Sequence, residues 1–174
     1  MEKMIFRTPN NDDLDNVFEC HKLCFSRSEQ WYKSFILPAL KDSLIVELNN
    51  KIIAILLEGP ISPCDPNEIK DFMPLTSMGN DLKNNNLCNT FINGITMLCV
   101  HPEFRKQGIA KKLIQLHQEK HKDENIICLH TRKTNNAYNL YLQMGYEHIA
   151  TIKDKYFLPT EDSYFMIKIN IKIK

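Results

Sequence analysis

The sequence predicts an α/β fold, and three features of its 174 residues indicate that class. Two apolar runs typical of buried strands end at Val100 and Thr131. Each run is followed by a turn and by a segment in which apolar residues recur at helical spacing. The last strand-like segment alternates apolar residues with lysines, as a strand with one buried and one wet face does. Strands and helices therefore follow one another along most of the chain.

Capping residues and helical spacing define the N-terminal elements. A short strand at Met4–Arg7 precedes a helix that Asn11–Asp15 caps and that continues to Phe25. A second helix is expected from its cap, Ser28, to Leu40. The chain is thus predicted to open with one strand and two helices.

A hairpin and a long loop come next. Leu44–Leu48 and Lys51–Leu57 are expected to pair, because the two asparagines between them tolerate the positive φ of a two-residue turn. Residues 59–92 hold four of the eight prolines and an asparagine-rich stretch. This composition predicts a long loop insertion with little regular structure.

The segment Ile95–Gln115 predicts a binding site for an anion. A buried strand, a turn that Pro102 forces and a helix that opens near Gly108 follow one another. The first-turn amides of a helix have no partner within it, and the helix dipole favours negative charge at that end. Gly108 allows close approach to the backbone, while Arg105 and Lys106 add positive charge. The turn is therefore suited to a phosphorylated ligand.

A second strand and helix follow the first pair. The strand Ile126–Thr131 leads to a turn and helix cap at Thr134-Asn135-Asn136, and the helix Ala137–Met144 ends at Gly145. Two C-terminal strands are then expected at Glu147–Tyr156 and Ser163–Ile173, joined by a short loop that holds Pro159 and Glu161. 

Two motifs resemble the signatures of the GNAT superfamily of N-acetyltransferases. The spacing Arg-x-x-Gly-x-Ala that begins at Arg105, preceded by Val-x-Pro, resembles the motif that binds the pyrophosphate of coenzyme A. The segment from Asn135 through Tyr141 to Gly145-Tyr146 resembles the second signature, beside the pantetheine and thiol. The resemblance implies one GNAT domain over residues 1–174, with a mixed, twisted sheet splayed at its centre and flanking helices. It also implies acetyl-CoA as the co-substrate.

The resemblance further implies which residues form the site. In this family the strand before the phosphate loop offers backbone N–H groups to the acetyl carbonyl, where such donors stabilise developing charge. Tyr141 matches the tyrosine beside the sulfur, an acid for the departing thiolate, although a tyrosine packed under the sheet is the structural alternative. The residues implied in binding acetyl-CoA are Leu98, Cys99, Val100, Arg105, Lys106, Gln107, Gly108, Ile109, Ala110, Lys111, Asn135 and Tyr141.

His130 is the candidate general base. Alternation along its strand places His130 on one face with Cys128, at the C-terminal end, where ligands bind in open sheets. An ordinary imidazole pKa near ~6.5 suits removal of a proton at neutral pH. A histidine that is merely hydrogen-bonded at a strand end is the alternative interpretation.

The amine substrate is predicted from a narrower resemblance. The string from Leu129-His130 to Asn135-Asn136 is similar to a segment of protein N-terminal acetyltransferase catalytic subunits. This similarity implies that Phe25 and Tyr156 contact the peptide N-terminus. Some of these enzymes carry a tyrosine, as a second base, at a position that falls near Gly94 here, so that base is missing. An α-amine, with a pKa of ~8, is also easier to deprotonate than a lysine amine at ~10.4.

Several alternatives and exclusions accompany this hypothesis. A small-molecule amine, a lysine side chain and a non-catalytic acyl-CoA-binding module remain open, and an auxiliary subunit is a candidate partner. A net charge of +1 with interspersed acids and bases does not favour nucleic acid, and no apolar run is long enough to span a membrane. We expect a cytoplasmic location, with the nucleus as the alternative.

The cysteines and histidines are expected to have structural roles. Cys20 and Cys24 should pack inward from a helix. No cysteine is expected in the electropositive helix-start setting of a nucleophile, which favours direct transfer in a ternary complex. His117 and His121 are four residues apart on a helix, where flanking lysines favour a solvated face. No metal ion is expected there or elsewhere.

Overall fold

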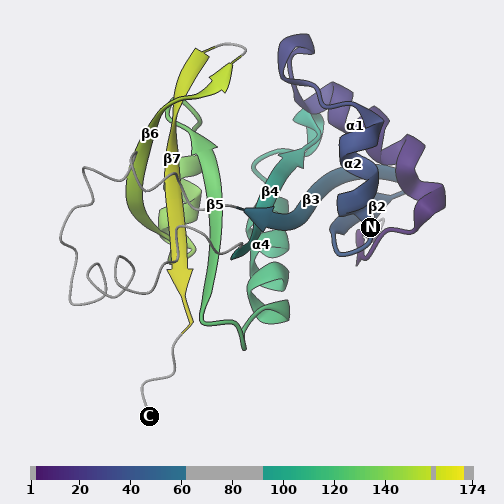
Figure 1. Cartoon of the computed structure of the whole chain (residues 1–174). Coiled ribbons are helices and arrows are strands. Elements are labelled where there is room, and N and C mark those ends of the chain that lie inside the picture. The colour runs from purple at the N-terminus through teal and green to yellow at the C-terminus, as the bar shows by residue number, and fades with distance from the viewer. Residues whose placement is uncertain (1–2, 62–91, 158–159, 171–174) are drawn as a thin grey trace. The chain divides into compact units, whose positions relative to one another are not determined.

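The computed structural model describes residues 3–61, 92–157 and 160–170, except for the side chains of residues 28, 156 and 157. Contacts group the chain into two compact units (Figure 1). Unit 1 comprises Met1–Gly59 with Ile95–His121, and unit 2 comprises Pro60–Gly94 with Lys122–Lys174. The predicted loop insertion lies, from residue 62 to residue 91, outside the described residues. A single domain over residues 1–174 stays a prediction.

Unit 1 contains four strands in the order β1-β2-β3-β4, of which β1–β2 and β2–β3 pair antiparallel. Strands β3 and β4 extend into unit 2 at the ends next to the insertion. Three α-helices and three short 3-10 turns complete the unit. In chain order its elements are β1 (Ile5–Arg7), η1 (Asn11–Asp13), α1 (Leu14–Cys24), η2 (Arg27–Glu29), α2 (Lys33–Leu40), β2 (Leu44–Leu48), β3 (Lys51–Ile61), β4 (Ile92–Val100), η5 (Pro102–Phe104) and α4 (Ile109–Lys120).

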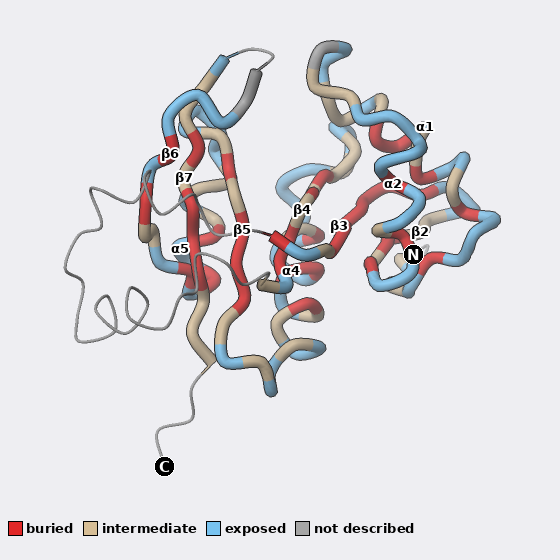
Figure 2. The backbone as a smooth tube through the Cα atoms, viewed as in Figure 1, coloured by how far each residue is buried: buried red, intermediate tan, exposed pale blue. Residues whose placement is uncertain are grey.

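The β2–β3 hairpin confirms the prediction for its turn. Asn49 and Asn50 have φ angles of 52° and 60°, the left-handed conformation that a two-residue hairpin turn requires. The core of unit 1 lies where α1 and α2 pack on β2–β4, around the fully buried residues Val17, Ile36 and Ile55. Figure 2 shows buried backbone along β3 and β4. Apolar packing therefore fixes β4, the strand that leads through the turn to α4.

Three expectations for unit 1 are wrong. The helix expected from Ser28 is interrupted: η2 ends at Glu29, and α2 begins at Lys33 without a side-chain cap. Strand β3 continues through Gly59 and Pro60 to Ile61, so the insertion begins later than its composition indicates. His117 is not on a solvated face, because its side chain is fully buried.

In its described residues, unit 2 has an antiparallel layer in the order β5-β7-β6 and the helix α5. Its core contains Cys128, Ile152, Phe165 and Ile167. Gly145 has a φ of 82° and ends the helix as predicted. The elements are β5 (Ile126–Arg132), α5 (Ala137–Gln143), β6 (Glu147–Phe157) and β7 (Thr160–Ile169).

Strand β7 differs from its prediction in two ways. It begins at Thr160, so Glu161 is part of the strand rather than of a loop. Its second face is not wet, because Met166 is fully buried there and Lys168 Nζ donates a hydrogen bond of 3.0 Å to the carbonyl of Met144. The end of α5 therefore lies over this face. Alternation with lysine indicated the strand correctly but gave the wrong environment for one side of it.

Candidate active site

The turn before α4 has the backbone geometry of an anion-binding loop. Gly108, the N-cap of α4, has a φ of 79°, and Lys106 has a φ of 61°. The first backbone hydrogen bond of the helix runs from the Lys112 amide to the Gly108 carbonyl, at 3.0 Å. The amides of Ile109, Ala110 and the following residue therefore precede the helical ladder. A Cβ atom built on Gly108 would meet no atom within 4 Å, so this side of the turn is open.

Arg105 fixes the shape of the turn. Its Nε atom donates to the Val100 carbonyl at 3.0 Å, and its Nη2 atom contacts the Cys24 carbonyl at 3.4 Å. The guanidinium thus links the end of β4, the turn and the end of α1 while remaining exposed. Lys106 and Gln107 are exposed beside it. Two cations consequently lie next to the first-turn amides of α4.

The strand before this turn presents its residues alternately. Leu98 and Val100 are half-buried, whereas Cys99 is buried in the core of unit 1. These residues are predicted to bind the acetyl carbonyl through backbone N–H groups, so the alternating burial of their side chains does not bear on that prediction.

Three cysteine thiols form a cluster next to the turn. The sulfur atoms of Cys20, Cys24 and Cys99 lie within 4.8 Å of one another. Hydrogen bonds from the other two thiols, with the nearby charge of Arg105 and His101, lower the pKa of Cys24 well below its usual range. The same hydrogen bonds and burial raise the pKa of Cys99. The inward packing of Cys20 is confirmed. Cys24 is the last residue of α1, so it does not have the helix-start setting that the sequence analysis excludes, although Arg105 and His101 lie near it.

In unit 2, His130 has a partner that the sequence did not reveal. The Nδ1 atom of His130, on β5, lies 3.1 Å from the hydroxyl oxygen of Ser163, on β7, and its ring stacks at 4.9 Å from that of Phe165. Ser163 is fully buried, and its oxygen lies 3.4 Å from the Thr131 carbonyl. A serine on the apolar face of β7, in line with Phe165, is the signal that could have identified this partner.

The other predicted residues of unit 2 lie on α5 and its N-terminus. Tyr141 is buried, with its ring edge-on to Tyr146 at 5.8 Å. Asn135 is exposed, and its side-chain oxygen accepts a hydrogen bond of 2.9 Å from the Ala137 amide. This bond closes the turn that precedes α5, whose N-cap is Asn136 without a side-chain cap hydrogen bond, and it orients the loop between β5 and α5.

Glu161 ties this loop to the β6–β7 hairpin. One of its carboxylate oxygens accepts hydrogen bonds of 2.6 Å from the amide and the hydroxyl of Thr134, and the other lies 3.2 Å from Arg132. Burial opposes ionisation, but these hydrogen bonds outweigh it and lower the pKa of Glu161. Glu161 is paired with Tyr156 in the hairpin. The end of the hairpin next to its turn, where Tyr156 lies, is therefore held in place.

The two residues expected to contact substrate have different environments. Phe25 is half-buried, packs on the core of unit 1 and has its ring 4.8 Å from that of His21. The side chain of Tyr156 is outside the described residues. The His21 ring also accepts a 2.7 Å hydrogen bond from the Trp31 amide, which fixes the loop between α1 and α2.

A separate cavity of about 500 Å³ lies in unit 1 between α1, the β2–β3 hairpin and η5. Its lining includes Glu19, Lys51 and Phe104 but none of the residues from 105 to 111. The predicted anion site is therefore the exposed turn before α4, not this cavity.

Comparison with known proteins identifies the family. Residues 77–148 match the family described as "Acetyltransferase (GNAT) domain". The chain carries a GNAT acetyltransferase domain. The match includes the strand, turn and helix described above, together with His130 and Tyr141. The predicted acetyl-CoA-dependent N-acetyltransferase class is thereby confirmed.

Solved structures show the GNAT fold at low sequence identity. The NatC complex bound to Gag peptide and CoA matches with 20% identity and a TM-score of 0.70, over 96% of this chain and 98% of that chain. Chaetomium thermophilum Naa20 with a bisubstrate analogue has 20% identity and a TM-score of 0.70, with 95% and 86% covered. Arabidopsis thaliana NAA60 with acetyl-CoA has 18% identity and a TM-score of 0.72, with 96% and 99% covered. The predicted fold class is confirmed.

The GNAT domain has no membrane-spanning helix in the part of the chain that the structure describes, since each helix there is too short or too polar. The residues predicted to bind acetyl-CoA lie in unit 1, except Asn135 and Tyr141 in unit 2. A cytoplasmic location stays a prediction.

Proposed function

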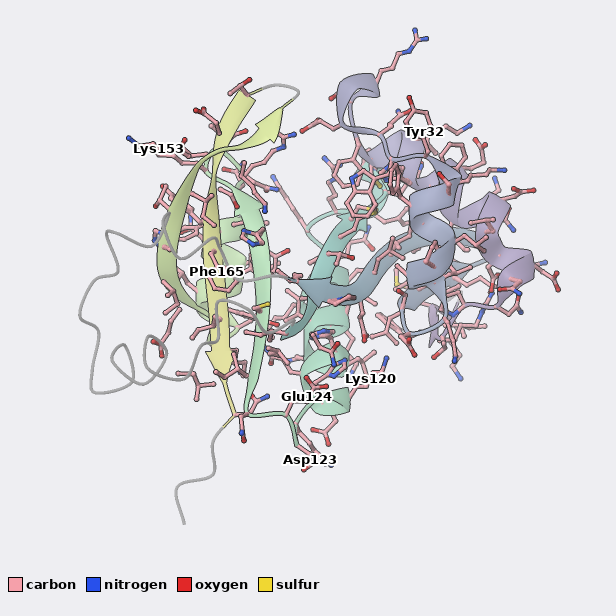
Figure 3. The ribbon with its side chains drawn as sticks, viewed as in Figure 1. Tyr32, Lys120, Asp123, Glu124, Lys153 and Phe165 are labelled. Carbon is pink, nitrogen blue, oxygen red and sulfur yellow. The ribbon has the colours of Figure 1, made fainter. Side chains whose placement is uncertain are left out.

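We propose that this GNAT domain transfers acetyl from acetyl-CoA to the α-amine of a protein or peptide. The observation that carries the proposal is a group of exposed aromatic rings directly after α1. Tyr32 is 75% exposed and Phe35 64% exposed, and Trp31 lies beside them. Figure 3 shows the Tyr32 side chain at the surface of unit 1. Exposed aromatic side chains are typical of surfaces that bind peptides.

This group of rings, Trp31, Tyr32 and Phe35, follows Phe25 in the segment whose sequence resembles a peptide-binding loop. The hydrogen bond from the Trp31 amide to His21 holds the start of that segment in one conformation. A small amine or an amino sugar would not need several apolar rings in solvent. A peptide buries them, which offsets part of the cost of binding. The solved structures with bound peptide or bisubstrate analogue are consistent with this substrate class.

The turn before α4 fits the diphosphate of acetyl-CoA. The open side of Gly108, the first-turn amides of α4 and the charge of Lys106 together favour an anion. Acetyl-CoA, when bound, supplies the activated acetyl group. We infer that the amides near Leu98 to Val100 hold the acetyl carbonyl, where fixed donors are worth ~3 kcal/mol each as charge develops.

His130 is proposed to remove the proton from the amine. If Ser163 donates its hydroxyl hydrogen to the Thr131 carbonyl, its oxygen accepts a hydrogen bond from Nδ1–H of His130. The Nε2 atom then carries the lone pair and serves as the base. Ser163 is thus a positioning residue that selects the tautomer. Tyr141 is proposed as the acid for the thiolate, and the acetyl group is proposed to pass directly from acetyl-CoA to the amine.

A panel of amines tests the proposal. The enzyme is incubated with acetyl-CoA and peptides that differ in their first residues, with the same peptides blocked at the N-terminus but carrying lysine, and with polyamines and amino sugars. We expect turnover of free N-termini, with kcat/KM varying with the first residues. Turnover confined to blocked lysine peptides or to small amines would contradict the α-amine assignment. Binding of acetyl-CoA with no turnover of any amine would indicate an acyl-CoA-binding module.

Substitution of Lys106 tests the coenzyme site. Lys106→Gln is expected to weaken acetyl-CoA binding about 3- to 10-fold at low salt, because one cation beside the diphosphate is lost. The φ of 61° makes any residue except glycine comparably strained there, so glutamine changes mainly the charge. Calorimetry measures the affinity. Lys112→Gln, an exposed lysine on the same helix, is the control and should bind as the native enzyme does.

An auxiliary subunit belongs to the same proposal. One of the matching structures is a complex, NatC. Leu23 and Leu37 in unit 1 are 60% and 46% exposed, and these apolar side chains are ones that a partner would cover. The tagged enzyme should therefore be recovered from a cell extract together with any bound partner, and the amine panel repeated with it. A stable partner is expected to raise activity toward peptides.

A further inference from the structure

Three metal-ligating side chains converge at the C-terminal end of α4, all within unit 1. Glu58 lies near the end of β3, His117 lies in the last turn of α4, and His121 follows it. One ligand atom from each lies within 4.8 Å of the others. All three side chains are almost entirely buried: Glu58 is 5% exposed, His117 is 0% exposed and the His121 side chain is 10% exposed. Clusters of acidic groups on a protein surface are not buried to this extent.

His117 has an environment that its own hydrogen bonds do not explain. Neither ring nitrogen has a hydrogen-bond partner among the described residues, and the same is true of the Oε1 atom of Glu58. Buried polar groups in proteins are nearly always paired, so an imidazole without partners indicates that something else meets it. Burial, followed by the charges of His121 and Lys120, lowers the pKa of His117 to about 3.

The cluster already holds one positive charge. The Oε2 atom of Glu58 is 2.8 Å from Nε2 of His121 and 2.9 Å from Nζ of Lys120, which also contacts the Asp42 carbonyl. Figure 3 shows the Lys120 side chain beside α4. Lys120 is 41% exposed, so its ammonium group can turn toward solvent while Glu58 stays buried. A cation bound between the three ligands would then balance the buried carboxylate.

We propose that Glu58, His117 and His121 bind one zinc ion, or a similar divalent transition-metal ion, with water as a fourth ligand. Two imidazole nitrogens and one carboxylate oxygen are a ligand set that Zn²⁺ takes in proteins, and two histidines four residues apart lie on one face of a helix. Tetrahedral zinc places its ligand atoms roughly 3.4 Å apart. The ligand atoms, which lie within 4.8 Å of one another, adjust to this spacing when the ion binds.

The site is structural rather than catalytic. His117 and His121 follow Gly108 by nine and thirteen residues, so the ion lies roughly 14–20 Å along the helix from the amides at Gly108. It would instead link the end of α4 to β3, the strand that lies between β2 and β4 in the sheet. Because α4 carries the turn proposed to hold the diphosphate, a fixed helix also fixes that turn. The metal site does not depend on which amine the enzyme acetylates.

Metal binding is measured on the full chain after treatment with a chelator. We expect calorimetry to show one Zn²⁺ bound per chain, and thermal unfolding to shift upward with added Zn²⁺, since an ion that binds only the native state stabilises it. Glu58→Gln and His117→Gln should each weaken binding at least tenfold and abolish the thermal shift. Glu119→Gln, the same change at an exposed residue of α4, is the control and should bind zinc as the native chain does.

Cobalt distinguishes this site from the thiol cluster of Cys20, Cys24 and Cys99. Co²⁺ bound to nitrogen and oxygen gives visible bands without the strong near-ultraviolet absorption of thiolate ligands. The expected spectrum lacks thiolate absorption and is lost in Glu58→Gln. No bound metal, a thiolate spectrum, or binding that both variants retain would overturn the proposal. Circular dichroism establishes that each variant is folded, and if His117→Gln is not, Glu58→Gln alone decides.

Discussion

Replacement of His130 by glutamine is expected to lower kcat for peptide acetylation by about 10²- to 10⁴-fold, the range typical of a lost general base. Glutamine keeps a similar length and polarity at the strand end but cannot take up a proton at neutral pH. The affinity for acetyl-CoA should stay within about threefold of the native value, because the proposed diphosphate site is formed by other residues. Steady-state kinetics on the preferred peptide and calorimetry with acetyl-CoA measure the two quantities separately.

Two further variants establish the role of His130. His148→Gln, at a half-buried histidine of β6 that hydrogen-bonds Ala150 and Thr151, should leave kcat nearly unchanged. Ser163→Ala removes the partner of Nδ1, so it should lower kcat and move the acidic limb of the pH–rate profile, whereas loss of packing alone would not move that limb. If His130→Gln retains native kcat, His130 is not the base.

The pairing of His130 with Ser163 shows why part of the site was not predictable. The two residues are 33 positions apart, and they meet because β5 and β7 pair with His130 opposite Phe165. A shift of one residue in that register would turn Ser163 to the other face. Local patterns indicate each strand, but they do not define which strands pair or in which register. The turn at Gly108, in contrast, depends only on neighbouring residues, and the sequence predicted it correctly.

The environment of His117 was mistaken for a different reason. His117 is three and four residues after Ile114 and Leu113, both fully buried, so it lies on the apolar face of α4. The periodicity therefore predicted burial, but the flanking lysines and the polarity of histidine suggested a solvated face. The partner that makes the position informative, Glu58, comes from β3, 59 residues earlier in the sequence. Sequence spacing alone could not connect them.

The interruption at residues 30–32 is a case in which a local signal was overridden. Ser28 is a good helix cap, and helical propensity continues through Leu40. The structure instead has extended backbone at Gln30 and Tyr32, because the Trp31 amide donates to the ring of His21 rather than to a helical carbonyl. A tertiary hydrogen bond outweighs one turn of helix. The aromatic rings of the proposed peptide surface are exposed as a result.

Gly94 supports the largest prediction for stability. A Cβ atom at Gly94 would lie 2.3 Å from the Cys128 carbonyl oxygen and 2.6 Å from Cδ1 of Ile61, all in unit 2. Side-chain rotation can relieve the contact with Ile61, but the contact with a backbone carbonyl requires β4 and β5 to separate locally. Gly94→Ala should therefore destabilise the fold by about 3 kcal/mol, the upper end for overpacking, and lower Tm by roughly 6–12 °C.

Gly59→Ala is the matched control. A Cβ atom there would lie 3.2 Å from the Cγ2 atom of Thr96, a side chain that can move by a few tenths of an ångström, so the expected loss is below about 1 kcal/mol. Thermal and denaturant unfolding of both variants measure the difference. Equal stability of Gly94→Ala and the native chain would show that β4 and β5 do not approach as closely as described.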